Sequence, residues 1–142
     1  MSTRTAALVV GIVFAVIGIL GFMPAPPAPD APALTMEHGH GMILGMFPTN
    51  TAHNVVHLLF ALLGIAAWAG GWARTNIQVL ALSYGLLTVL GLIPATQTTF
   101  GLVPIWGNDV FLHGAVAVAA AYFGFVRGNV DVHTHAPTPH RA

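Results

Sequence analysis

Residues 51–71, TAHNVVHLLFALLGIAAWAGG, form an unbroken run without a single Asp, Glu, Lys or Arg. At a rise of about 1.5 Å per residue, a helix of this length crosses the hydrocarbon core of a bilayer, which is about 30 Å thick. Lipid offers no hydrogen-bond partners to the backbone, so a spanning segment must be a helix or part of a closed barrel. The run lacks the alternation of barrel strands, and it therefore predicts a transmembrane helix.

Three more apolar runs surround this one, at about residues 5–23, 77–93 and 109–126. Of the 142 residues, 56% are hydrophobic and only 6% are charged, against about 25% charged residues in an average soluble domain. The sequence therefore predicts an all-α integral membrane four-helix bundle in residues 1–127. We expect an outer Pro- and His/Met-containing loop at 24–50 and a polar, disordered tail at 128–142. The first run also fits a signal peptide, but it ends in the same Leu-Gly-x-x-Pro as the third run, which favours a retained helix.

Composition and missing motifs exclude several functions. The formal net charge is +0 and only 4 residues are Lys or Arg, so no basic surface is available for nucleic acid. The chain has no cysteine, which excludes disulfides and thiolate metal sites. It also lacks a nucleophile elbow, a phosphate-binding glycine loop and an HExxH motif, so we expect no enzymatic activity.

An internal repeat relates the two halves of the chain. Gly45-Met46-Phe47-Pro48 and Gly101-Leu102-Val103-Pro104 lie 56 positions apart, as do His57 and His113. Upstream, Leu20-Gly21-Phe22-Met23-Pro24 matches Leu90-Gly91-Leu92-Ile93-Pro94 at an offset of 70. Each unit holds two spans and so keeps its orientation, which predicts two tandem helical hairpins related as a parallel repeat.

The four arginines predict the orientation of the bundle. Arg4, Arg74, Arg127 and Arg141 fall in the N-terminus, the second connection and the C-terminal tail, which share one side of the membrane when there are four spans. The positive-inside rule makes that side, and both termini, cytoplasmic.

The repeat also places four polar side chains together near the outer surface. His57 and His113 should lie at equal depth, and His53 and Asp109 precede them by four residues on the same helix faces. The sequence therefore predicts a cluster of His53, His57, Asp109 and His113, with Asn54 and Asn108 close by.

Three interpretations of this cluster remain open. The first is a structural one, in which the histidines bridge helices through hydrogen bonds and Asp109 stabilises the fourth helix, with no cofactor. In the second, the cluster binds one transition metal ion, copper, zinc or iron, through His53, His57, Asp109 and His113. In the third, His57 and His113 are the axial ligands of a b-type haem, although no arginine lies on the outer side to hold its propionates.

The chain resembles a known family across about residues 6–125. The resemblance lies in Val10-Gly11-Ile12-Val13-Phe14, in His53-Asn54-Val55-Val56-His57 and in Asn108-Asp109-Val110-Phe111-Leu112-His113. These motifs are similar to those of small bacterial membrane proteins catalogued as domain of unknown function 4383 (DUF4383). The resemblance implies a four-helix bacterial membrane protein and carries over to His53, Asn54, His57, Asp109 and His113, but it supplies no activity. We expect the protein in the bacterial inner membrane.

These observations favour a non-enzymatic membrane protein of structural or interaction class. Metal binding through the His/Asp cluster is the alternative, followed by haem binding. Besides the lipid bilayer, the sequence leaves open a membrane-protein partner or a homo-oligomer.

Overall fold

A computed structural model describes residues 1–28 and 31–127 as four long helices with one short strand pair. The helices are α1 (Thr3–Leu20), α2 (Thr51–Gly70), α3 (Ala73–Leu92) and α4 (Asn108–Ala121), and α4 continues as the π-helix η1 (Tyr122–Arg127). The predicted all-α four-helix bundle is thereby confirmed. The predicted disordered tail at 128–142 lies outside the described residues.

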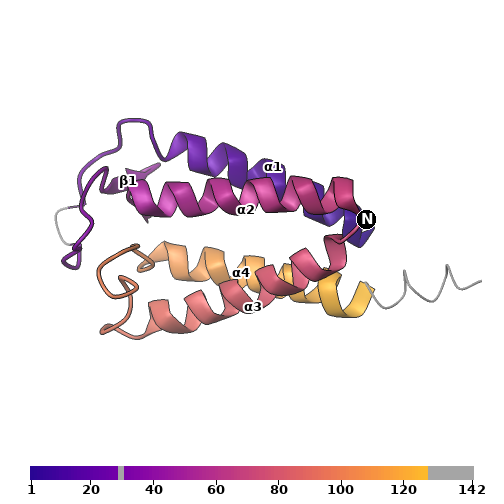
Figure 1. Cartoon of the computed structure of the whole chain (residues 1–142). Coiled ribbons are helices and arrows are strands. Elements are labelled where there is room, and N and C mark those ends of the chain that lie inside the picture. The colour runs from indigo at the N-terminus through magenta and orange to yellow at the C-terminus, as the bar shows by residue number, and fades with distance from the viewer. Residues whose placement is uncertain (29–30, 128–142) are drawn as a thin grey trace, which may run out of the picture.

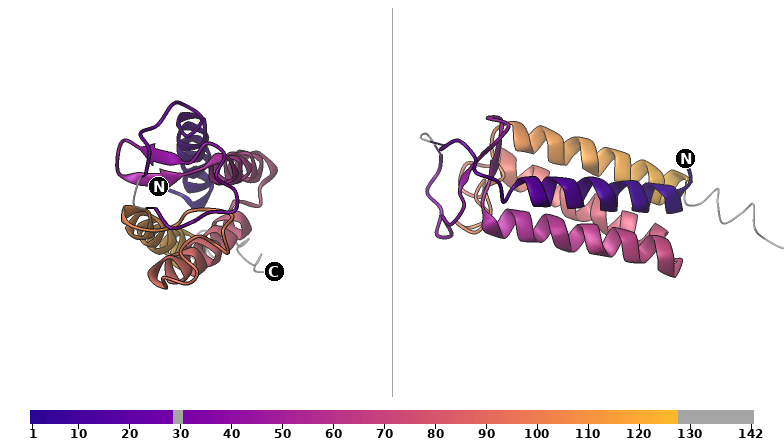
Figure 2. Two further views of the ribbon diagram at one scale, coloured as in Figure 1. Left: turned by 90° about the vertical axis from the view of Figure 1, so that its left-hand side faces the viewer. Right: turned by 90° about the horizontal axis from the view of Figure 1, so that it is seen from above.

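The four helices run side by side, and in the end-on view they follow one another around the bundle in chain order (Figure 1, Figure 2). α1 packs mainly on α2, and α3 mainly on α4, while α1 also meets α3 across the bundle. The N-terminus, the α2–α3 turn and η1 lie at one end, and the long connections lie at the other. Each helix, with α4 and η1 taken as one, is long and apolar enough to cross a membrane. The protein is therefore a multi-pass membrane protein whose outer surface contacts lipid.

Helices α1 and α2 approach each other closely at small residues. A Cβ added at Gly64 of α2 would lie 2.9 Å from the backbone oxygen of Ala7 and 3.0 Å from the Cα of Gly11 in α1. Close approach of this kind is how membrane helices gain packing contacts without a hydrophobic driving force. The core of the bundle consists of Ala6, Ala7, Phe14, Ala61, Ala73, Ile77, Leu80, Ala81, Tyr84 and Ala120.

Two local features differ from the sequence-based expectation. Helix α3 begins at Ala73, where the sequence predicted residue 77, because its first turn is polar and the hydropathy pattern did not include it. The 24–50 loop contains an antiparallel pair of strands, β1 (Gly41–Ile43) and β2 (Phe47–Thr49). Strands of three residues with a proline inside one of them leave no recognisable period in the sequence.

Several contacts in one half of the chain recur at the repeat-equivalent positions of the other. Leu44 and Gly45 have positive φ, at 54° and 67°, and so do Phe100 and Gly101, at 60° and 87°. Close contacts pair Gly18 with Leu58 and Thr88 with Gly114, and likewise Gly21 with Asn54 and Gly91 with Val110. These correspondences support the predicted tandem repeat.

Candidate functional site

Helix α2 begins at a residue that fixes its position against both long connections. Asn50 is fully buried and its side-chain oxygen accepts a hydrogen bond from the backbone N–H of His53 at 2.8 Å, as an N-cap does. Its side-chain nitrogen donates to the backbone oxygens of Met36 and Leu102, each at 2.8 Å. The first turn of α2, which carries His53, is therefore held in place by hydrogen bonds. His57 follows one turn later on the same face.

Helix α4 supplies His113 together with a carboxylate that contacts it. Nδ1 of His113 lies 2.8 Å from the backbone oxygen of Asp109 and 3.0 Å from its Oδ2. A ring nitrogen carries one proton, so Nδ1 donates to one of these oxygens at a time. Both acceptors favour the tautomer protonated on Nδ1, which leaves the lone pair of Nε2 free.

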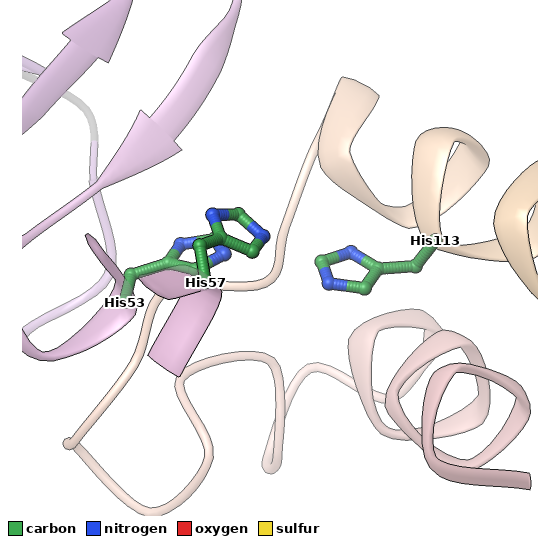
Figure 3. Close-up of side chains that lie close together, drawn as sticks. All are labelled: His53, His57 and His113. Atoms are coloured by element: carbon green, nitrogen blue, oxygen red, sulfur yellow. The ribbon is translucent and has the colours of Figure 1, made fainter. Parts of the chain in front are cut away.

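The three histidines converge inside the bundle (Figure 3). One ring nitrogen from each of His53, His57 and His113 lies within 4.8 Å of the others. The side chains are only 4%, 7% and 3% exposed, respectively. Asp109 is equally buried but lies behind His113 and not in the group of converging nitrogens. The structure therefore brings three of the four predicted site residues together and connects the fourth to them through His113.

Hydrogen bonds within the described residues satisfy this cluster only in part, although the ring of His53 hydrogen-bonds to the backbone of Pro48. Nδ1 of His53, Nδ1 of His57 and Oδ2 of Asp109 are buried and have no hydrogen-bond partner there. Oδ2 of Asp109 has no partner when Nδ1 of His113 donates its proton to the backbone oxygen of Asp109 instead. A buried polar group without a partner costs about 1–3 kcal/mol, so the arrangement contains unused capacity for a ligand.

Two aromatic rings from the other helices complete the surroundings. The ring of Phe14 in α1 lies 5.4 Å from that of His57, and the ring of Tyr84 in α3 lies 4.7 Å from that of His113. Phe14 and Tyr84 stack on each other at 5.3 Å between ring centres. Sequence reasoning missed both residues as parts of the site. The signal was present, because they are 70 positions apart and thus equivalent in the repeat.

A model of the family described as "Domain of unknown function (DUF4383)" matches residues 4–126 of this chain. The chain belongs to the DUF4383 family. This confirms the resemblance noted in the sequence, and the matched range contains all three converging histidines. No curated protein and no solved structure matches the chain. The family match carries no activity for this DUF4383 protein.

Two cavities flank the histidines. One, which we name the α2/α3 cavity, has a volume of about 230 Å³ and is lined by all three histidines, by Val56 of α2 and by Leu87 of α3. The other, the α1/α4 cavity, has about 220 Å³ and is lined by His53 and His57, by Ile17 of α1 and by Leu112 of α4. In the predicted repeat, Val56 corresponds to Leu112 and Ile17 to Leu87, and on that prediction the two cavities are counterparts in the two hairpins.

The arrangement has the chemistry of a metal site. Imidazole nitrogens are ligands for zinc, copper, iron and nickel. In a tetrahedral site with bonds of about 2.0–2.1 Å, ligand nitrogens lie about 3.3–3.4 Å apart, so the three rings would have to move closer together than 4.8 Å to share an ion. The contact between Asp109 and His113 is the carboxylate–histidine arrangement that orients metal ligands and raises their basicity.

Proposed function

We propose that this DUF4383 protein binds one transition metal ion inside its membrane bundle through His53, His57 and His113. Asp109 orients His113 from behind. The observation that carries the proposal is the convergence of three buried ring nitrogens within 4.8 Å of one another. We propose binding only, without an enzymatic step.

The structural interpretation accounts less well for the same residues. If the histidines served only to bridge helices, their ring nitrogens would be expected to donate to or accept from neighbouring helices. Among the described residues, Nδ1 of His53 and of His57 has no such partner, and Nδ1 of His113 bonds within its own helix. None of these contacts joins α2 to α4, whereas an ion shared by the three rings would.

The donor set favours copper, zinc or iron over haem. Three neutral imidazoles are a common set of protein ligands for these ions. A haem between His57 and His113 would need a flat space between the two rings. That region is already occupied by His53, whose ring centre lies 4.5 Å from that of His57 and 6.0 Å from that of His113.

We further propose a bacterial inner-membrane location with cytoplasmic termini, and the distribution of charge supports the orientation. Arg4, Arg74 and Arg127 belong to the end that carries the N-terminus, whereas Glu37 and Asp109 belong to the opposite end. Arg4 donates to the backbone oxygen of Trp68 at 3.0 Å and lies over its ring, as expected of a residue at the interface. The metal site then lies near the outer surface.

The decisive experiment is metal analysis of the full chain purified in detergent, followed by titration with Co²⁺ or Zn²⁺. We expect one bound ion per chain. A His57→Ala/His113→Ala variant should lose it, because two of the three ligands are gone. His38→Ala/His40→Ala is the matched control, since these loop histidines are outside the cluster, and it should keep the ion. A folded wild-type protein that binds no ion would disprove the proposal.

A further inference from the structure

The three histidines form part of the wall of the α2/α3 cavity, and the rest of that wall is mainly apolar. Its other lining residues are Val56, Leu87, Leu102, Val103 and Ile105, together with Tyr84 and Thr99, which carry hydroxyl groups. No charged side chain lines it. An ion bound by the three rings would therefore face a mainly apolar cavity.

We infer that the ion keeps an open coordination position toward this cavity, and that the position takes a small, uncharged, membrane-soluble ligand. The inference rests on the proposed metal site and goes beyond it. A structural metal site is closed by four protein ligands, whereas a site with three protein ligands leaves the fourth position to an exogenous molecule.

The described residues bring three histidine ligands together, with no carboxylate among the converging atoms. The only group of three or more histidine or carboxylate ligands that converges within them is His53, His57 and His113. Asp109, the predicted fourth ligand, contacts Nδ1 of His113 at 3.0 Å. With the carboxylate engaged behind a ligand, the fourth position is left to the cavity.

The lining of the two cavities decides which one the open position faces. All three histidines line the α2/α3 cavity. The α1/α4 cavity is lined by His53, His57 and Asp109 but not by His113. An ion bound to all three rings therefore borders the α2/α3 cavity.

The size and polarity of the cavity select the class of ligand. At about 230 Å³, it is smaller than the pockets of roughly 300–1,000 Å³ that take drug-sized molecules. An ion such as azide would have to leave water for an apolar wall within the membrane, at a large desolvation cost. An uncharged diatomic molecule with a lone pair is small enough for the cavity and has no such desolvation cost. It can reach the cavity by partitioning into the lipid.

Carbon monoxide binding to the Cu(I)-loaded full chain in detergent micelles tests the inference. We expect an infrared carbonyl band from a copper adduct. Val56→Phe fills the α2/α3 cavity and should lower the affinity for carbon monoxide by roughly tenfold or more at unchanged copper content. Leu112→Phe, at the repeat-equivalent position, fills the α1/α4 cavity and should leave the affinity unchanged. Leu87→Phe and Ile17→Phe repeat this comparison should the first pair fail to fold.

The outcomes separate this inference from the metal site itself. Bound copper without a carbonyl adduct overturns the open position and leaves metal binding intact. Loss of the adduct in Leu112→Phe but not in Val56→Phe overturns the choice of cavity. A spectral change when azide is added to the Co²⁺-loaded protein overturns the restriction to uncharged ligands. Failure to bind copper or cobalt at all overturns both proposals.

Discussion

Replacing Asp109 by Ala distinguishes a carboxylate that orients a ligand from one that is a ligand. In the structure Oδ2 of Asp109 lies 3.0 Å from Nδ1 of His113, and the backbone oxygen of the same residue lies 2.8 Å from it. Alanine removes the first acceptor and keeps the second. The ring therefore retains its tautomer and its approximate orientation, but it loses the negative charge that raises its basicity.

The geometry sets the expected loss of metal affinity in Asp109→Ala. Removing an orienting partner of a metal-bound histidine typically lowers metal affinity by about 10–100-fold. Because the backbone acceptor remains, we expect the lower end of that range, about tenfold, which corresponds to about 1.4 kcal/mol. If Asp109 were instead the fourth ligand, as the sequence predicted, the loss should exceed roughly 100-fold and the coordination number should fall.

The assay is competitive titration of Co²⁺ against a chromophoric chelator, together with the visible spectrum of the bound ion. Asn108→Ala is the matched control, because it also changes the first turn of α4 but at an exposed position. It should leave the affinity unchanged. Unaltered affinity in Asp109→Ala, or a loss far beyond 100-fold with a changed cobalt spectrum, would refute the reasoning.

Three further predictions concern stability and topology. Asn50→Ala removes an N-cap and leaves two backbone oxygens without their donor. It should therefore lower the free energy of unfolding in mixed micelles by about 2–4 kcal/mol. The control Ser2→Ala, which removes an exposed N-cap, should lower it by only about 0.5–1 kcal/mol. Gly64→Ala should destabilise by about 1–3 kcal/mol, because its Cβ meets backbone atoms of α1. Gly85→Ala should instead stabilise the protein by about 0.5–1 kcal/mol, because nothing lies within 4 Å of the added Cβ. Equal effects at the two glycines would contradict the packing argument. The chain has no cysteine, so single Cys variants report topology. Leu44→Cys should react with an impermeant thiol reagent in intact cells, and Ser2→Cys should react only after lysis. The reverse pattern would invert the proposed orientation.

The four helices could be predicted from sequence because each long apolar run has one stable form in lipid. The same logic fails where the chain leaves the membrane. Helix α3 begins with Ala73, Arg74, Thr75 and Asn76, a polar turn that hydropathy assigns to a loop. The β1–β2 pair and the π-helix η1 depend on tertiary contacts, such as the hydrogen bond from Gln78 to the backbone oxygen of Gly124. No local pattern in the sequence encodes such contacts.

The site was predictable to the extent that the repeat fixes depth. Equal positions in two hairpins place His57 and His113 at one level, and the spacing of four residues adds His53 on the same face. The conformation of the Asp109 side chain is a different matter. Whether its carboxylate points at the converging nitrogens or at His113 depends on side-chain torsions that spacing does not determine. Asn50 could have been found, because an Asn directly before an apolar helical run is a standard start signal.

The cluster is asymmetric because the two halves of the predicted repeat carry different residues at positions 53 and 109. Two identical hairpins would place a symmetric set of four side chains about the bundle axis, with equivalent residues at 53 and 109 and at 57 and 113. In this chain position 53 is a histidine and position 109 an aspartate, so one hairpin supplies two imidazoles and the other supplies one imidazole with its orienting carboxylate. Four imidazoles could close an ion on all sides, whereas three with a carboxylate behind one of them leave one side open. Asp109→His would restore the symmetric set, and we expect it to bind metal more tightly while losing the carbon monoxide adduct. An Asp109→His variant that keeps the adduct would show that the open position does not depend on this difference between the hairpins.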